Sequence, residues 1–311
     1  MSITSVRAIQ RCPRCGNENK AANFQCTFCG KRLRIEGIER VFIWRRIEDE
    51  WAAPYPWYRK LYYLFINSPR AFWDINHQRK KAPSKIIFFT ISIVYAFVWM
   101  TLFLHLKIPD FPLNINSFVA PLIGLLTGFL FGIIYHFLLF EILIWLFTKG
   151  ANYAVDYSAK LESRFGKKSR EQFEKYDEAH MSPFSIYKGG VLQQKYAYKN
   201  KMMFCAFIPF IITYIIEIIV ISIAFGTMEF DLNDIGLRTL FQFHAPVWVV
   251  IYTIEALTIM LWIPSLMAIA IRELSNSSTY RVVLSSYIVA IIVAIFYFFL
   301  RPAFTWMVLG S

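Results

Sequence analysis

Residues 85–106 read KIIFFTISIVYAFVWMTLFLHL, an apolar block with no charged residue after Lys85. A helix of roughly 20 apolar residues crosses the ~30 Å hydrocarbon core of a bilayer. Four further long apolar blocks follow, at residues 118–147, 202–225, 246–271 and 281–300. The pattern predicts an all-α polytopic membrane protein with a bundle of five transmembrane helices.

Composition and charge agree with this prediction. The chain is 57% hydrophobic and only 17% charged, whereas about a quarter of the residues in a soluble domain are charged. Residues 1–84 hold 16 Lys and Arg against 7 acids, and residues 149–201 are also basic, while the segments 107–117 and 226–245 are not. Basic loops stay on the cytoplasmic side. We therefore expect a cytosolic N-terminus and an external C-terminus, in the cell membrane if the source is prokaryotic.

Four cysteines lie close together near the N-terminus. Cys12 and Cys15 form one C-x-x-C pair, Cys26 and Cys29 form another, and a glycine follows each pair. Two such pairs supply four thiolates that close tetrahedrally around zinc and leave no position for a catalytic water. The pattern predicts a zinc ribbon with one structural Zn²⁺. A disulfide pairing is the alternative, but a cytosolic location is reducing and favours the metal.

The ribbon has few apolar residues, so the metal must supply much of its folding free energy. Its surface is basic and suits anionic lipid, an acidic protein face or nucleic acid. We expect membrane lipid and a cytosolic or membrane protein as partners, and not nucleic acid, because the ribbon is tethered to a membrane and carries few aromatic side chains for base stacking.

An aromatic and basic stretch follows over residues 54–75. Apolar side chains recur there at helical spacing, with basic residues opposite, which predicts an interfacial amphipathic helix that ends at Pro69. A basic cluster then precedes the first span, and either anchors the chain by the positive-inside rule or senses specific lipids. The predicted membrane-interface residues are Trp57, Tyr58, Arg59, Lys60, Arg79, Lys80 and Lys81.

The chain thus divides into three predicted parts. Residues 1–40 form a cytosolic zinc ribbon, and residues 41–84 form a linker with the interfacial helix. Residues 85–311 form the transmembrane domain, with a long cytosolic loop at residues 149–201.

Small residues form a line in the second apolar block. Gly124, Gly128 and Gly132 repeat every four residues, so that one face of the helix allows another helix to approach closely. We expect this seam to pack within the monomer.

Four ionisable residues lie inside the apolar blocks: His136, Glu141, Glu217 and Glu255. Such groups are costly in lipid and face the bundle interior. They form either a proton or cation path or hydrogen bonds across the bundle. Transporters commonly show internal repeats, and the sequence shows none, which favours the second interpretation. The common motifs of metalloproteases, serine hydrolases and phosphate-binding loops are also missing, so we predict that the chain is not an enzyme.

The order of these parts resembles the Yip family of membrane proteins, which interact with Ypt/Rab GTPases. The likeness covers residues 65–300 and includes SPRAFW at 68–73 and YAY at 196–198. At 262–293 a span containing Trp262 runs into the short basic turn Ile271-Arg272-Glu273, followed by Tyr280-Arg281. The sequence departs from the family at Ala270, where glycine is frequent, and in its long central loop.

The resemblance implies a non-enzymatic membrane scaffold or adaptor. Eukaryotic Yip members bind prenylated small GTPases and act in membrane trafficking, whereas ribbon-bearing sequences resemble prokaryotic and archaeal members, for which a GTPase partner is not implied. The alternative function is a small proton- or ion-coupled transporter or channel that uses the four buried ionisable residues.

Overall fold

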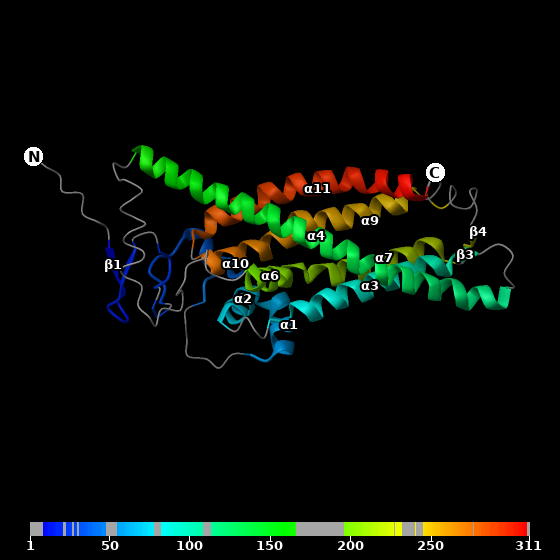
Figure 1. Ribbon diagram of the computed structural model, residues 1–311, viewed down its shortest axis with the longest axis horizontal. Helices are drawn as coiled ribbons and strands as arrows, with labels where there is room; N and C mark the ends of the chain where they lie inside the picture. The colour runs from blue at the N-terminus through cyan, green and yellow to red at the C-terminus, as the bar shows by residue number, and fades with distance from the viewer. Residues whose placement is uncertain are drawn as a thin grey trace, which may run out of the picture. The chain divides into compact units, whose positions relative to one another are not determined.

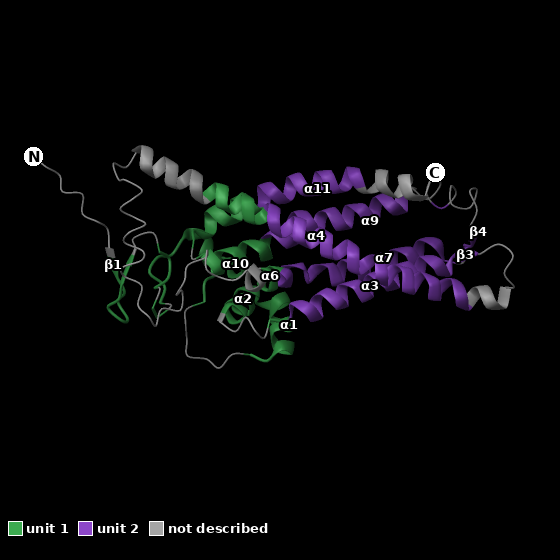
Figure 2. Ribbon diagram, viewed as in Figure 1, with its two compact units in different colours: residues 1–82, 147–203, 265–286 green, residues 83–146, 204–264, 287–311 purple. Residues whose placement is uncertain are grey.

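A computed structural model describes most of the chain (Figure 1). The described residues are 9–20, 23–26, 28–29, 31–47, 55–77, 82–107, 113–165, 196–226, 228–231, 240, 245–275 and 277–309. They belong to two compact units, which Figure 2 shows in different colours. Unit 1 comprises residues 1–82, 147–203 and 265–286, and unit 2 comprises residues 83–146, 204–264 and 287–311.

Helices make up most of the described structure. The α-helices are α1 (Trp57–Ile66), α2 (Ser68–His77), α3 (Ser84–Leu104), α4 (Leu113–Phe165), α6 (Tyr196–Phe204), α7 (Pro209–Phe225), α9 (Ala245–Leu257), α10 (Ile263–Ser275) and α11 (Thr279–Leu309). Short 3-10 turns are η1 (Gly37–Arg40), η2 (Phe42–Trp44) and η4 (Cys205–Phe207), and η6 (Thr258–Trp262) is a π-helical turn. The strands are β1 (Ile9–Arg11), β2 (Glu18–Lys20), β3 (Leu106–Lys107) and β4 (Phe230–Asp231).

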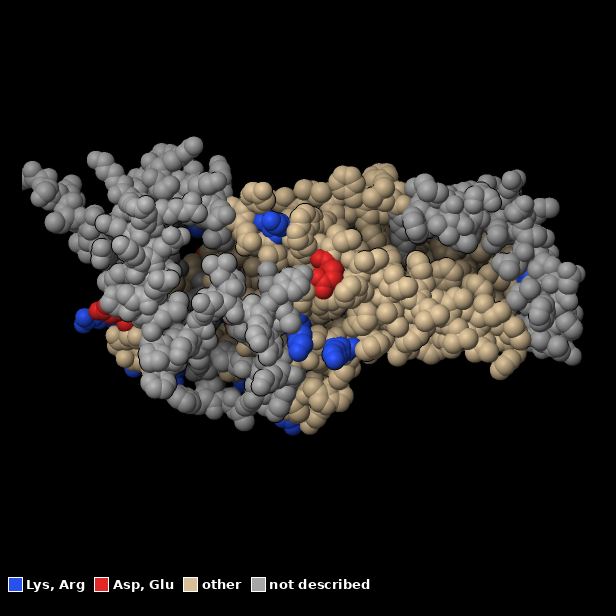
Figure 3. All heavy atoms as spheres, in the orientation of Figure 1, with Lys and Arg blue, Asp and Glu red and all other residues tan. Residues whose placement is uncertain are grey.

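Five described helical segments are long and apolar enough to cross a membrane: Ser84–Leu104, Phe118–Ala154, Asn200–Phe225, Pro246–Ser275 and Thr279–Leu300. They coincide with the five predicted blocks, so the expected fold class is confirmed. Figure 3 shows one face of the molecule, where few of the described residues are Lys, Arg, Asp or Glu. The chain is a multi-pass membrane protein.

Unit 2 contains the main packing of these helices. Helix α3 packs against α7, and α7 packs against α9. The glycine seam of α4 lies against α3, since a Cβ added at Gly128 would lie 2.6 Å from the Cβ of Trp99 and one at Gly124 would lie 2.7 Å from the Cβ of Phe103. No larger residue fits at this distance without displacing α3. In the described structure the seam thus faces α3 of the same chain.

Two prolines mark changes of helix geometry in unit 2. Pro209 is the first residue of α7, directly after the 3-10 turn η4. Pro264 follows the π-helical turn η6. A proline inside a helix lacks an N–H donor and its ring clashes with the carbonyl four residues earlier. Locally altered turns next to Pro209 and Pro264 relieve this conflict without ending the spans.

In unit 1 the predicted interfacial helix is two helices that pack against each other, α1 and α2. The break falls at Asn67, whose side-chain oxygen accepts a hydrogen bond from the backbone N–H of Arg70 at 3.4 Å. Asparagine favours the N-cap position, and proline is tolerated in the first turn of a helix. Pro69 therefore helps to begin α2, and the prediction that it ends a helix was wrong.

Candidate metal centre and the buried charge cluster beside it

Two short hairpins carry the four cysteines in unit 1. Strand β1 pairs antiparallel with β2, from Ile9–Lys20 to Arg11–Glu18, and Gln25 bridges to Arg32 in the second hairpin. In the first turn, the N–H of Gly16 donates to the carbonyl of Cys12 at 2.9 Å. Gly16 has a φ of 73°, a conformation that glycine adopts without strain. A glycine follows each of the two cysteine pairs. The second of them, Gly30, lies outside the described residues.

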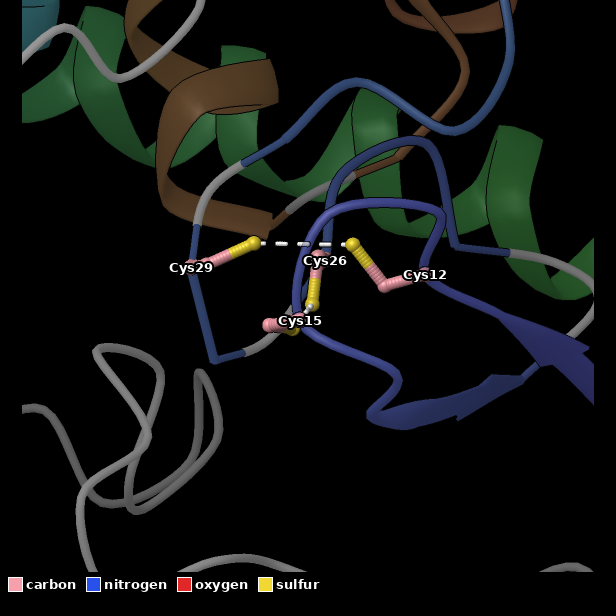
Figure 4. A group of neighbouring side chains, drawn as sticks. All are labelled: Cys12, Cys15, Cys26 and Cys29. Atoms are coloured by element: carbon pink, nitrogen blue, oxygen red, sulfur yellow. Dashed lines mark hydrogen bonds between the residues drawn. The ribbon is translucent and has the colours of Figure 1, made fainter.

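The four cysteine sulfurs face one another (Figure 4), and all lie within 4.8 Å of one another. The Sγ atoms of Cys12 and Cys29 are 3.5 Å apart, and those of Cys15 and Cys26 are 3.7 Å apart. Tetrahedral zinc with Zn–S bonds of ~2.3 Å requires sulfurs roughly 3.8 Å apart. All four cysteines are free thiols. The donor set and its spacing therefore fit one tetrahedral metal ion.

Hydrogen-bond donors surround the cysteine sulfurs. The backbone N–H of Phe28 and the side-chain amide of Asn19 each donate to Cys26 Sγ at 3.4 Å. Burial raises the pKa of the Cys12 thiol, but backbone hydrogen bonds from Arg14 and Cys15 outweigh burial and lower the pKa to about 7. Burial raises the pKa of the Cys29 thiol. Because a metal displaces protons from such thiols, its binding weakens as the pH falls.

A second cluster in unit 1 involves residues 35–47, which we call the tether. The Arg46 Nε donates to Glu39 Oε1 at 2.7 Å, and both side chains are fully buried. The hydroxyl of Thr279, the first residue of α11, donates to the same carboxylate oxygen at 2.6 Å. Arg46 also donates to the backbone carbonyl of Ser277. These contacts bind the tether to the turn between α10 and α11.

Further contacts hold the tether at both of its ends. Glu36 accepts the hydroxyl of Ser278 at 2.5 Å and the backbone N–H of Tyr280 at 2.9 Å, so its carboxylate caps the N-terminus of α11. An acceptor with negative charge is favourable there, because the first N–H groups of a helix lack internal partners. Arg272, near the end of α10, donates to the carbonyls of Trp44 and of Arg45, the latter at 2.9 Å. Glu36 thus fixes the N-terminal end of the tether, and Arg272 fixes its C-terminal end.

The metal centre and the tether are joined by residues next to the ligands. The guanidinium of Arg46 lies 5.0 Å from the ring centroid of Phe24, within the range of a cation–π interaction. The side-chain amide of Gln25 donates to the carbonyl of Ile47 at 3.1 Å. Gln25 directly precedes the candidate ligand Cys26, so one residue of the chain contacts the tether beside the cysteine cluster.

The structure changes two interpretations drawn from the sequence. Arg272 and Glu273 were expected in a turn after the fourth span, but they are buried in the last turns of α10. Lys60 was expected on a basic interfacial face, but it is fully buried and its Nζ lies 3.4 Å from Asp74 of α2. A buried charge requires an opposite charge nearby, and neither partner was evident from local patterns.

The charge cluster itself escaped the sequence analysis. Glu36, Glu39, Arg46 and Thr279 belong to no motif, and Glu39 and Thr279 are 240 residues apart. The available signal was weak: Glu36 and Glu39 are acids among the many basic residues of positions 31–46. Acids in such a region are candidates for internal pairing.

A polar cluster lies among the spans of unit 2. His136 of α4 hydrogen bonds through Nε2 to the hydroxyl of Tyr214 of α7 at 2.7 Å, and both are fully buried. The hydroxyls of Tyr135 and Tyr297 are 2.6 Å apart, which links α4 to α11. Glu217 lies about one turn from Tyr214 on α7, and both side chains are buried. His136 is therefore hydrogen bonded to a residue one helical turn from Glu217.

Glu217 and Glu255 lie on neighbouring helices and are both buried. The hydroxyls of Thr213 on α7 and Thr258 in η6 are 2.8 Å apart. Glu217 is four residues after Thr213, and Glu255 is three residues before Thr258. Because successive spans run in opposite directions, both glutamates lie about one helical turn from this bond and on the same side of it. Glu141, one turn beyond His136, is only half-buried.

The remaining predicted interface residues divide into two groups. Trp57, Tyr58 and Arg59 are exposed on α1, which agrees with an interfacial position. Arg79, Lys80 and Lys81 lie outside the described residues.

A scan against models of protein families gave no match to this chain, and searches of characterised proteins and of solved structures gave none either. The likeness to the Yip family therefore rests on the sequence motifs alone.

Proposed function

We propose that the chain is a non-enzymatic membrane scaffold or adaptor of the Yip type. In this role the ribbon, loaded with zinc, presents a surface to a cytosolic or membrane protein partner. The observation that supports it most strongly is the buried binding of the tether to the α10–α11 turn through Glu39, Arg46 and Thr279. A ribbon held in this way keeps one orientation on the α10–α11 turn. A fixed orientation reduces the entropy lost when a partner binds.

The proposed orientation follows from the charges. Basic residues concentrate before the first span and between the second and third spans, and such segments remain in the cytosol. The ribbon then lies in a reducing compartment, where four thiols bind zinc and do not form disulfides. Because eukaryotic members of the Yip family bind small GTPases, a small GTPase is one candidate partner.

The buried polar cluster of unit 2 supports a second candidate, a proton- or ion-coupled transporter or channel. His136 and Tyr214 are hydrogen bonded inside the bundle, and Glu217 is buried about one turn from Tyr214; such groups commonly mark proton or ion paths in membranes. Hydrogen bonding between spans is the other use of these groups. The two candidates differ in a measurable property, because only the second predicts flux.

The adaptor role predicts that a protein partner co-purifies with the metal-loaded form alone. The intact protein is solubilised in mild detergent and purified beside a Cys12→Ser, Cys15→Ser form and a Cys205→Ser control. Zinc is measured in all three, and co-purifying proteins are identified by mass spectrometry. We expect one specific partner with the intact and Cys205→Ser proteins, and at least a tenfold reduction with the double variant.

Two outcomes contradict the adaptor role. One is equal recovery of every co-purifying protein from all three samples in several detergents. The other is proton or ion flux in liposomes that a folded Glu217→Gln, Glu255→Gln variant has lost, which favours the transporter.

A further inference from the structure

The outer side of the tether carries a row of exposed apolar side chains. Val41, Phe42 and Ile43 are 48%, 56% and 47% exposed. They are consecutive, and the opposite side of the same segment is held by Glu39 and Arg46. A fixed row of large apolar side chains is unusual on a surface that faces only water, and it indicates an interaction surface.

The length of α11 indicates where its first residues lie relative to a membrane. The candidate span Thr279–Leu300 has 22 residues, or about 33 Å at 1.5 Å per residue. This length is close to the thickness of the hydrocarbon core, about 30 Å, so we place the start of α11 at one boundary of the bilayer. The tether binds Ser277, Ser278, Thr279 and Tyr280, directly before Arg281.

Basic and aromatic residues surround the apolar row. Arg40 and Arg45 flank it and are both exposed. Tyr280 of α11 is 59% exposed, and Arg281 beside it is exposed as well. Apolar side chains with adjacent basic residues bind the boundary between headgroups and acyl chains, and they do so more strongly when the lipid is anionic.

We propose that the tether is a lipid-binding surface. Val41, Phe42 and Ile43 enter the boundary between headgroups and acyl chains, and Arg40 and Arg45 bind the phosphates of anionic phospholipids. The proposed occupant is therefore the anionic leaflet at which α10 ends and α11 begins. This surface is separate from the predicted interfacial residues of α1 and from the basic cluster before the first span. It leaves the ribbon free to bind a protein.

Photo-crosslinking from position 42 tests this placement. The photoreactive amino acid p-benzoyl-phenylalanine replaces Phe42 in the full-length protein, and in a second protein it replaces Phe296 of α11, which is 61% exposed on a span. Both are reconstituted in nanodiscs of phosphatidylcholine with or without phosphatidylglycerol, irradiated and analysed by mass spectrometry. We expect lipid adducts at both positions. At position 42 alone, the adducts should favour phosphatidylglycerol.

A variant with Arg40→Gln and Arg45→Gln then tests the role of charge. Each basic residue near an anionic surface contributes roughly a fivefold preference, so the phosphatidylglycerol preference at position 42 should fall by at least fivefold. Lipid adducts at position 296 combined with none at position 42 would overturn the proposal. Crosslinks from position 42 to a second copy of the chain or to another protein, in place of lipid, would overturn it as well.

Discussion

Replacing Arg46 by methionine is expected to release the tether from the α10–α11 turn. The substitution leaves the Glu39 carboxylate buried without the guanidinium that lies 2.7 Å from it. Removing one partner of a buried ion pair costs about 3–5 kcal/mol. The N–H groups of Glu39, Val41 and Trp44 are hydrogen bonded within the tether. Their hydrogen exchange, followed by mass spectrometry, should accelerate by about a hundredfold or more.

Arg34 offers a matched control for this experiment. It lies directly before the tether and its side chain is exposed, so Arg34→Met should leave the exchange of the tether within about threefold of the original, since surface substitutions change stability by about 0.5 kcal/mol. A Glu39→Gln, Arg46→Met double variant removes both charges and should recover part of the protection. Equal exchange in the Arg46→Met and Arg34→Met proteins would show that the ion pair does not hold the tether.

Loss of one metal ligand is expected to unfold the ribbon. Cys26 is fully buried, and its sulfur accepts hydrogen bonds from Asn19 and Phe28. Structural zinc contributes an apparent binding free energy of about 10–16 kcal/mol in small domains of this kind. A Cys26→Ser protein should therefore contain less than a tenth of the zinc of the original chain by elemental analysis, and a protease should cleave its ribbon at much lower concentration.

The fifth cysteine provides the control. Cys205 is buried in η4 of unit 2 and is not part of the cysteine cluster. A Cys205→Ser protein should keep one zinc per chain and the original protease resistance. Full zinc content in the Cys26→Ser protein would instead mean that the metal has other ligands.

The five spans were predictable because their signal is local and repeated. An uncharged run such as residues 86–104 specifies a membrane helix with no knowledge of its neighbours. The cysteine pairs were predictable for a similar reason, since the spacing Cys-x-x-Cys determines the chemistry of the ligand set. Gly128 could also be placed on a packing face, because glycine repeats at helical spacing indicate close approach.

The charge cluster was not predictable, because its members meet only after folding. Glu39 pairs with Arg46 seven residues later, but Glu36 and Glu39 also bind the start of α11, more than 230 residues away. Lys60 shows the same limit: helical periodicity within α1 cannot show that Asp74 of a second helix lies beside its ammonium group. The partners of buried charges are determined by tertiary packing, and periodicity within one segment carries no information about them.

Hydrogen exchange of residues 36–47 before and after zinc removal tests most directly whether the metal centre and the membrane helices are coupled through the tether. The intact protein is held in nanodiscs and compared with the same sample treated with a membrane-impermeant chelator. We predict that the metal-loaded protein protects both the ribbon and the tether, and that chelation exposes both together, because Phe24 and Gln25 contact Arg46 and Ile47. A tether that stays fully protected while the stripped ribbon exchanges freely would contradict the coupling.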